Sequence, residues 1–341
     1  MTNRRIHFSS DGGIILGLVV CDGFFADAPI RVQTHVHDDH MAGFESSKGF
    51  QTIVMSKATR ALLELESDAD LPYRANLAAI DAGQFHKMQE VVIQLLPSHH
   101  MLGAVQVVVR MTDGTRLAYS GDFNWPLESV AQADILVIDS TYGSPNYTRM
   151  YTHSQVDERF VALVTEHLRR GAIHLKAHRG TLQKALQLLN GVVQVPVVAP
   201  IQVCKEVDIY RRFGYQISPV LCLESSDGRY AVSCGQYVRL YGRGEGNLFG
   251  LDSGTAINLS AYMCDPKDPV LEHNPNSYTV AMSCHASFEE TIQYVAASGA
   301  TRVITHHILG SHIDELAREL RKRLGIEAEP ATSGSTHSWG E

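Results

Sequence analysis

Short apolar runs separated by turns divide the first 140 residues, and this pattern predicts a sheet-rich domain. The runs have the length and composition of strands, and residues 57–66 form the one convincing helical segment among them. The expected strands cover residues 14–20, 30–34, 91–96, 105–110, 117–120 and 135–139. Histidine and aspartate fall repeatedly at the ends of these runs. Because a sheet holds such positions rigidly, the pattern is typical of an active site built on a β scaffold.

The densest of these clusters follows the run at residues 30–34, where the sequence reads H-x-H-x-D-H. His35 and His37 are two residues apart, so in an extended segment their side chains point the same way. Asp39 and His40 can then face a second metal beside the first. Imidazole and carboxylate groups are zinc ligands, and two adjacent ions clamp the oxygens of a displacement reaction. A solvated turn with incidental histidines is the alternative. The cluster favours a metallohydrolase.

Three further places offer ligands for such a site. His99 and His100 follow the run at residues 91–96, and Asp122 follows a strand and a glycine. A carboxylate at Asp122 is able to bridge two metals, although Ser-Gly-Asp is also a common turn. His306 and His307 end an expected strand, a position where a histidine pair is more often structural than ligating. The residues alone leave the choice within each histidine pair open.

The pattern of expected elements changes after residue 142, where helices begin to alternate with strands. This rhythm predicts a small parallel sheet with flanking helices. Residues 216–260 are again β-like and rich in glycine, and the last dozen residues are expected to fray. Expected helices cover residues 154–170, 181–190, 203–213, 288–297 and 312–324, and expected strands cover 172–177, 195–199, 278–282 and 302–305.

Composition limits the class of protein. A chain of 341 residues, 44% hydrophobic and 19% charged, suits two globular domains. No apolar run approaches the roughly 20 residues of a membrane span, and no signal-peptide core is present, so a cytoplasmic protein without membrane contact is expected. Six cysteines without a C-x-x-C pair argue against a disulfide framework. A net charge of −8 does not indicate a nucleic-acid binder, but bound metals would add positive charge at the site.

The order of the motifs resembles the metallo-β-lactamase fold in its nucleic-acid-processing branch, which carries a β-CASP insert. The similarity covers almost the whole chain: H-x-H-x-D-H is followed by P-S-H-H-M-L-G-A at 97–104, Y-S-G-D at 119–122 and D-S-T-Y-G at 139–143. Residues 176–185 and 298–303 are similar to stretches of ligase-associated DNA exonucleases, and RNA-processing nucleases belong to the same branch. The chain departs from the branch at His99, where glycine is usual, and at Ser287, where aspartate is usual.

The resemblance implies an α/β fold: an αββα sandwich with an inserted β-CASP α/β domain. The sandwich would occupy residues 1–143 and 278–330, the insert residues 144–277, and a flexible tail residues 331–341. Two divalent metal ions are implied, zinc in the first place and manganese as the alternative. The implied metal ligands are His35, His37, Asp39, His40, His100, Asp122 and His307. An ungapped count from Gly299 favours His307 over His306. The residues expected to act in catalysis are Asp39, Asp139 and His285.

The implied activity is metal-dependent hydrolysis of phosphodiester bonds in DNA or RNA, with an exonuclease and DNA favoured. The implied partners are nucleic acid and helicase or ligase proteins. Two other functions stay open. One is a small-molecule metallohydrolase of the same fold, such as a lactonase or thioesterase, which generally lacks the insert. The other is an inactive binding subunit, against which the complete ligand set argues. Cleavage polarity and oligomeric state are not indicated.

Overall fold

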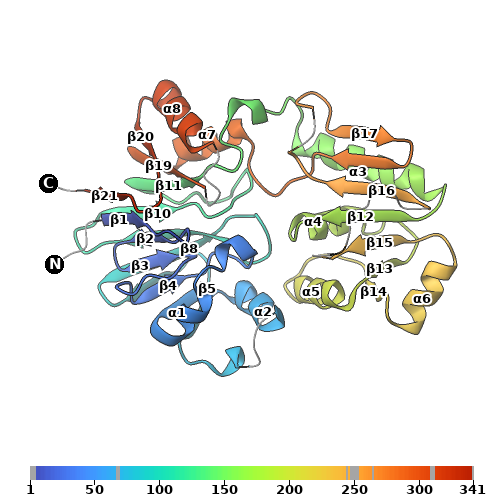
Figure 1. Ribbon diagram of the computed structural model, residues 1–341, viewed down its shortest axis with the longest axis horizontal. Helices are drawn as coiled ribbons and strands as arrows, with labels where there is room; N and C mark the ends of the chain where they lie inside the picture. Colours follow the sequence, from blue (N-terminus) through green and yellow to red (C-terminus); the bar gives the residue numbers. More distant parts are fainter. Residues whose placement is uncertain are drawn as a thin grey trace. The chain divides into compact units, whose positions relative to one another are not determined.

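The computed structural model describes residues 5–66, 70–242, 245, 253–262, 265–307 and 312–339. The chain divides into two compact units: unit 1 comprises Met1–Thr148 and His285–Glu341, and unit 2 comprises Arg149–Cys284. Within the described residues the protein is a mixed α/β protein with three seven-stranded sheets (Figure 1), which confirms the predicted α/β class. No helix in the described part of the chain is both long and apolar enough for a membrane crossing.

Unit 1 contains two of the sheets. Sheet 1 has the order β21-β1-β2-β3-β4-β5-β6, and sheet 2 has the order β20-β19-β11-β10-β9-β8-β7. The strands of sheet 1 are β1 (Arg5–Phe8), β2 (Ile14–Leu16), β3 (Val19–Cys21), β4 (Ile30–Val32), β5 (Thr52–Ser56), β6 (Leu77–Ile80) and β21 (Thr336–Ser338). Those of sheet 2 are β7 (Phe85–Met88), β8 (Val91–Pro97), β9 (Val105–Arg110), β10 (Arg116–Tyr119), β11 (Ile135–Asp139), β19 (Arg302–His306) and β20 (Glu327–Pro330).

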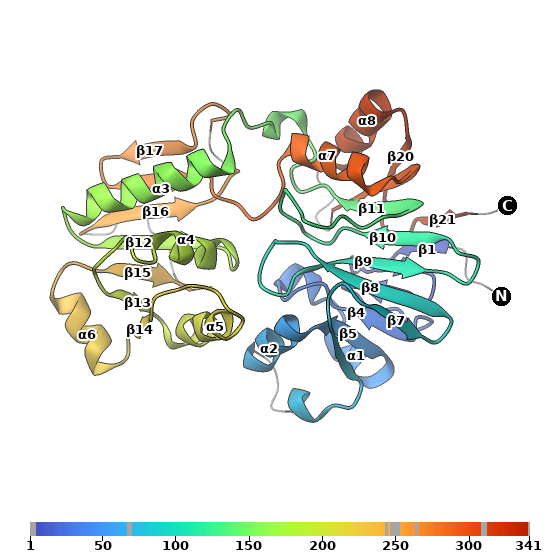
Figure 2. The ribbon, with the colours of Figure 1, turned by 180° about the vertical axis from the view of Figure 1, so that it is seen from behind.

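The two sheets of unit 1 share one apolar core, because alternate side chains of each strand point to the same face. Leu117 of β10 lies in this core together with Val32 of β4. The next residue of β10, Ala118, faces the other way and packs in a second cluster with Phe288 and Leu316. These two residues belong to α7 (Phe288–Ser298) and α8 (Ile313–Leu324), which lie beside β11 and β20 (Figure 2). Sheet 2 is therefore apolar on both faces, and each buried Phe or Leu contributes about 1.5–3 kcal/mol.

Sheet 1 is covered on its other side by helices α1 (Phe44–Phe50) and α2 (Lys57–Glu66), both of which contact β5. Short 3-10 turns at Asp38–His40, Leu71–Tyr73 and Pro145–Tyr147 complete the described helical segments of unit 1. The sequence pattern predicts no helix at the residues of α1. Helix α1 buries the face of β4 from which the polar side chains of Arg31 and Gln33 project.

Unit 2 is inserted between two neighbouring strands of sheet 2. The chain leaves that sheet after β11 and returns in β19, and these strands are parallel, with Asp139 opposite His306. Parallel neighbours need a crossover connection, and here the crossover contains the whole of unit 2. Because these two strands run the same way, Asp139 and His306 lie side by side at their carboxyl ends.

Unit 2 is built on sheet 3, whose order is β14-β13-β15-β12-β16-β18-β17. All described strand pairs in it are parallel except β17 with β18, in agreement with the predicted parallel sheet. Its strands are β12 (Ile173–Ala177), β13 (Val197–Ala199), β14 (Leu221–Cys222), β15 (Val238–Tyr241), β16 (Thr255–Leu259), β17 (Val270–Asn274) and β18 (Ser277–Val280). Its helices are α3 (His153–Leu168), α4 (Thr181–Leu189), α5 (Ile201–Arg212) and α6 (Ser226–Ser233).

Three local predictions differ from the structure. Residues 14–20 form a hairpin of β2 and β3 instead of one strand, because Gly17 turns the chain at a φ of +65°. Residues 216–260 include α6, whose first turn is capped by the Ser225 hydroxyl accepting a hydrogen bond from the amide of Gly228. The segment expected to fray contains β21, which pairs with β1 and so supplies the backbone partners of an otherwise unpaired edge.

Candidate metal centre

The H-x-H-x-D-H segment follows the end of β4. The chain stays extended through His37 and then tightens into the 3-10 turn Asp38–His40. His35 and His40 are buried, with 1% and 2% of their surface exposed, whereas the side chain of Asp39 is 55% exposed. The end of a buried strand thus carries its polar side chains to the edge of the core, as the sequence pattern indicates.

His100 reaches the same place from the loop between β8 and β9. This loop is closed by a hydrogen bond from the Ser98 amide to the Ala104 carbonyl. His99 adopts a positive φ of 56° and is exposed, so the next residue, His100, points inward and is 2% exposed. His100 therefore points into the cluster, whereas His99 lies outside it.

His35, His37, His100 and Asp122 form a compact group, in which one potential ligand atom from each lies within 4.8 Å of the others. Asp122 Oδ2 lies 3.6 Å from His35 Nε2 and 3.5 Å from His100 Nε2. His100 Nε2 also lies 3.1 Å from a nitrogen of His37. Ring nitrogens from two loops thus converge on one buried carboxylate, that of Asp122.

The protonation of this group fits a divalent cation. Burial, followed by the charges of neighbouring imidazoles, lowers the pKa of His35 and of His37 well below the ordinary histidine value. The buried Nε2 of His35 has no hydrogen-bond partner among the described residues. An orphaned buried acceptor is costly, and neutral imidazole nitrogens beside a carboxylate are the donor set that zinc prefers. These residues therefore fit a metal ion.

Asp122 also faces the second half of the motif. Its Oδ1 lies 3.4 Å from His40 Nε2, and Asp39 Oδ2 lies 3.8 Å from the same nitrogen. One oxygen of Asp122 thus faces His35 and His100 while the other faces His40. A carboxylate that serves two ions needs this division.

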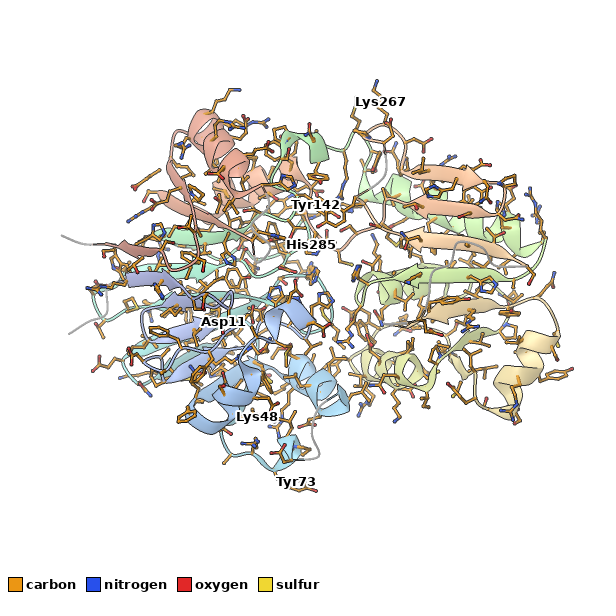
Figure 3. All side chains as sticks on the ribbon, viewed as in Figure 1. Asp11, Lys48, Tyr73, Tyr142, Lys267 and His285 are labelled. Atoms are coloured by element: carbon orange, nitrogen blue, oxygen red, sulfur yellow. The ribbon has the colours of Figure 1, made fainter. Side chains whose placement is uncertain are left out.

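Asp139 and His285 join the site from the end of β11 and from the segment before α7. Together with Asp122 they form a second group of potential ligands. His285 Nδ1 lies 3.5 Å from Asp139 Oδ2, and its Nε2 lies 3.8 Å from Asp122 Oδ2. Burial alone would lower the pKa of His285, but Asp122 and Asp139 outweigh it and raise this pKa above its ordinary value. Tyr142 packs edge-on to the His285 ring at 6.0 Å (Figure 3).

Asp22, at the end of β3, supports the site and was not singled out in the sequence. Its Oδ2 accepts hydrogen bonds from the Thr34 hydroxyl at 2.6 Å and from His40 Nδ1 at 2.8 Å. The same hydroxyl lies 3.0 Å from His35 Nδ1. A carboxylate on one ring nitrogen of a histidine leaves the other nitrogen free for a metal. The available signal was its place at the end of an apolar run, which it shares with the other site residues.

The structure does not bring every expected ligand into these two groups. Among the described residues, the groups that could hold a metal contain neither Asp39, His40, His306 nor His307. His306 lies in the core of unit 1, where its ring stacks on Phe8 at 5.3 Å. Burial lowers the pKa of His306 to about 4. His307 follows the end of β19 and is half-buried.

Gly103 sets the position of the His100 loop, and we expect its replacement to disturb the site. The Gly103 carbonyl accepts hydrogen bonds from the Ser56 and Thr59 hydroxyls. Its φ is +82°, and a Cβ there would lie 2.5 Å from the Thr59 amide nitrogen. Gly103→Ala should therefore cost at least about 2 kcal/mol of unfolding free energy and weaken zinc binding, measured by denaturant unfolding and chelator competition.

Gly83 provides the matched control for this substitution. Its φ is +83°, but a Cβ there would meet no atom within 4 Å. Gly83→Ala should cost about 1 kcal/mol or less and leave zinc affinity unchanged, because only the backbone preference is lost. Equal effects of the two substitutions on stability and zinc affinity would show that the crowding at Gly103 does not position His100.

Comparison with known proteins identifies the family to which the chain belongs. No protein-family model matches the chain. The chain is 30% identical over 131 residues to a protein of Acidianus ambivalens described as uncharacterized and encoded in the lig 3′ region, of which it covers 92%. It is 25% identical over 316 residues to a probable DNA ligase of Opitutus terrae and 21% identical over 282 residues to the 5′ exonuclease Apollo of Danio rerio. The chain belongs to the β-CASP branch of the metallo-β-lactamase family.

The extent of these similarities differs between the relatives. The matches to the ligase and to Apollo cover 86% and 77% of this chain, but only 28% and 46% of those proteins. The chain thus spans less than half the length of either of these two relatives. A crystal structure of an Enterococcus faecalis protein of unknown function aligns with 91% of this chain and 81% of its own, with a TM-score of 0.61 and 14% identity. At that identity the likeness concerns the fold alone.

Proposed function

We propose that this protein is a metal-dependent nuclease that hydrolyses phosphodiester bonds. The observation that carries the proposal is the position of Asp122, buried between the imidazoles of His35 and His100 on one side and His40 on the other. The pair of Asp139 and His285 lies beside it, where a proton donor is needed. The site therefore combines a metal-binding cluster with an acid–base pair.

Two divalent ions, zinc or manganese, would supply a hydroxide at neutral pH and offset the charge that develops on the phosphoryl oxygens. In this proposal His35, His37 and His100 would hold one ion, Asp39, His40 and His307 would hold the other, and Asp122 would serve both. The orphaned Nε2 of His35 and the division of the Asp122 oxygens support this assignment.

The remaining residues of the site handle protons and orientation. His285 Nε2 faces the metal-binding carboxylate, so it can deliver a proton to the oxygen that leaves the phosphorus. Asp139 faces the other ring nitrogen and fixes the ring. Asp139 is itself held, because its Oδ1 accepts hydrogen bonds from the amide and hydroxyl of Thr141. Asp39 is exposed beside His40, where it can accept a proton from the attacking water.

The architecture supports the same proposal. We assign the αββα sandwich to unit 1, because sheets 1 and 2 share a core and helices cover their outer faces. We assign the β-CASP insert to unit 2, which interrupts sheet 2 between β11 and β19. The proposed insert, residues 144–277, overlaps this compact unit, which spans Arg149–Cys284.

The proposed substrate is nucleic acid, with DNA and exonucleolytic cleavage favoured. The support is the naming of two relatives, one a 5′ exonuclease and the other a probable DNA ligase. A ligase is also the partner we propose, since one relative is described as a protein in the lig 3′ region and a second as a probable DNA ligase. A small-molecule hydrolase is the competing function, and the proposal differs from it in requiring cleavage of an oligonucleotide.

A cleavage ladder tests the proposal. Single- and double-stranded DNA and RNA, labelled at either the 5′ or the 3′ end, would be incubated with the protein and with zinc, manganese or magnesium. We expect stepwise shortening of DNA from one end, dependent on zinc or manganese. If lactone or thioester substrates are turned over and the oligonucleotides stay intact with every metal, the protein is a small-molecule hydrolase and not a nuclease.

A further inference from the structure

Arg31 is a fully buried cation beneath the metal-binding loop. It lies in the middle of β4, where its neighbours Ile30 and Val32 face the core between the two sheets. Arg31 therefore projects to the opposite face of sheet 1, and its guanidinium stacks over the Phe44 ring of α1 at 5.3 Å. Its exposed fraction is 0%. A buried charge of this kind is costly unless every donor is satisfied.

The guanidinium donates mainly to backbone carbonyls in and around the metal-binding loop, which we define as residues 33–42. Nη1 donates to the carbonyls of Gly23 at 3.0 Å and Ala42 at 2.7 Å, and Nη2 donates to the carbonyl of His40 at 3.0 Å. Nη1 also donates to the Ser47 hydroxyl at 3.2 Å. No carboxylate within the described ranges forms an ion pair with Arg31. The guanidinium thus bonds directly to the backbone around the motif, while the charge of Asp22 acts on it without a direct ion pair.

Gln33 extends this network to the start of the motif. Its Oε1 accepts hydrogen bonds from Nε and Nη2 of Arg31 at 3.0 and 2.7 Å. Its Nε2 then donates to the carbonyls of His35 at 2.6 Å and His40 at 3.0 Å, and to Asp22 Oδ1 at 3.3 Å. Arg31 and Gln33 together hold the backbone where the motif begins, where it ends and where the chain leaves it.

We propose that Arg31, acting through Gln33, is a positioning residue that holds the metal-binding loop in its ligand geometry before an ion binds. The inference rests on the proposed metal site. It requires that loss of the guanidinium weakens metal affinity in protein that is still folded. Within the described ranges no ligand side chain forms a hydrogen bond or ion pair with Arg31. Its effect therefore reaches the metal through the carbonyls of the loop and, by way of Gln33, through Asp22, which holds the His40 ring.

The geometry explains why arginine stands at this position. The carbonyls of Gly23, Ala42 and His40 and the amide oxygen of Gln33 lie in different directions around one planar group. A guanidinium presents five donors in a rigid fork, whereas an ammonium has three donors on a flexible stem. Lysine would keep the charge and lose the simultaneous bonds. Charge and positioning are therefore separable by the substitution Arg31→Lys.

The test measures zinc affinity and thermal stability of the full chain for Arg31→Lys, Gln33→Met and a control. Arg302→Lys is the control, because Arg302 also donates to a backbone carbonyl, that of Ser338, and pairs with Glu329 away from the metal cluster. Zinc affinity is measured by competition with a fluorescent chelator, and folding by circular dichroism. We expect Arg31→Lys to bind zinc about 10–100-fold more weakly and Gln33→Met to shift affinity in the same direction. Arg302→Lys should bind zinc as the parent does.

The outcomes separate the positioning role from the metal site itself. Parent affinity in folded Arg31→Lys, even with a lower Tm, would overturn the positioning role and leave Arg31 as a stabiliser of the fold. If Arg31→Lys does not fold, Gln33→Met decides, because it removes the amide without burying a new charge, and unchanged affinity in it overturns the proposal. A parent protein that binds no zinc would instead overturn the proposed function.

Discussion

Replacing Asp122 with alanine should remove the bound metal and abolish phosphodiester cleavage. Asp122 faces both halves of the cluster, with His35 and His100 near Oδ2 and His40 near Oδ1. Loss of an outer-shell partner of a metal typically costs 10–100-fold, and loss of a shared ligand should cost more. We expect cleavage to fall by more than about 100-fold and metal content, measured by mass spectrometry, to fall with it.

Asp134→Ala is the control for this substitution. Asp134 also lies in unit 1, but it pairs with Arg116 at 2.7 Å instead of with an imidazole. We expect this variant to keep the metal content and the cleavage rate of the parent. Near-normal metal content and activity in Asp122→Ala itself would rule out the shared-ligand role.

His285→Ala should show the second large effect, a slow enzyme that keeps its metal. His285 lies between Asp139 and Asp122, and its proposed task is to protonate the leaving oxygen. General acid catalysis contributes typically 10²–10⁴-fold, so we expect kcat to fall by about that factor with KM little changed. Steady-state kinetics and metal analysis on the same preparation check both parts.

The metal content of His285→Ala decides between two roles for this histidine. Loss of zinc together with activity would make His285 a ligand instead of a proton donor. His86→Ala, on the edge strand β7, serves as a control for the general effect of removing an imidazole from unit 1. It should retain both zinc and activity.

Much of the candidate site follows from one rule that is visible in the sequence. Histidine and aspartate at strand ends point to a common edge, and the structure brings His35, His37, His100 and Asp122 together there. Asp22 obeys the same rule at the end of β3. It escapes notice because a single aspartate after an apolar run looks like an ordinary turn residue, and its role depends on Thr34 and His40.

Arg31 and Gln33 show where pattern reading fails. The alternation of apolar Ile30 and Val32 with polar Arg31 and Gln33 is typical of a strand with one face in water. In the structure both polar side chains are buried, because α1 covers that face and contributes Phe44 and Ser47 to the surroundings of Arg31. Such burial depends on a helix that the local composition does not indicate.

Pairings between distant segments are the other part of the fold that composition does not reveal. Strand β21 was expected to belong to a frayed tail, yet His7 of β1 pairs with Thr336 across the sheet and contacts its hydroxyl at 2.9 Å. The two residues are 329 positions apart. The stability of β21 comes from filling the edge beside β1, so a short polar segment becomes a strand without a strand-like sequence.

If the proposed site cleaves phosphodiester bonds, its activity should require bound metal. The most direct measurement is single-turnover cleavage of an end-labelled DNA oligonucleotide by metal-stripped protein titrated with zinc or manganese, with metal content determined on the same samples. We expect no cleavage by the stripped protein and recovery that follows metal loading up to about two ions per chain. Full cleavage in the presence of chelator, or no cleavage of any oligonucleotide at full loading, would contradict it.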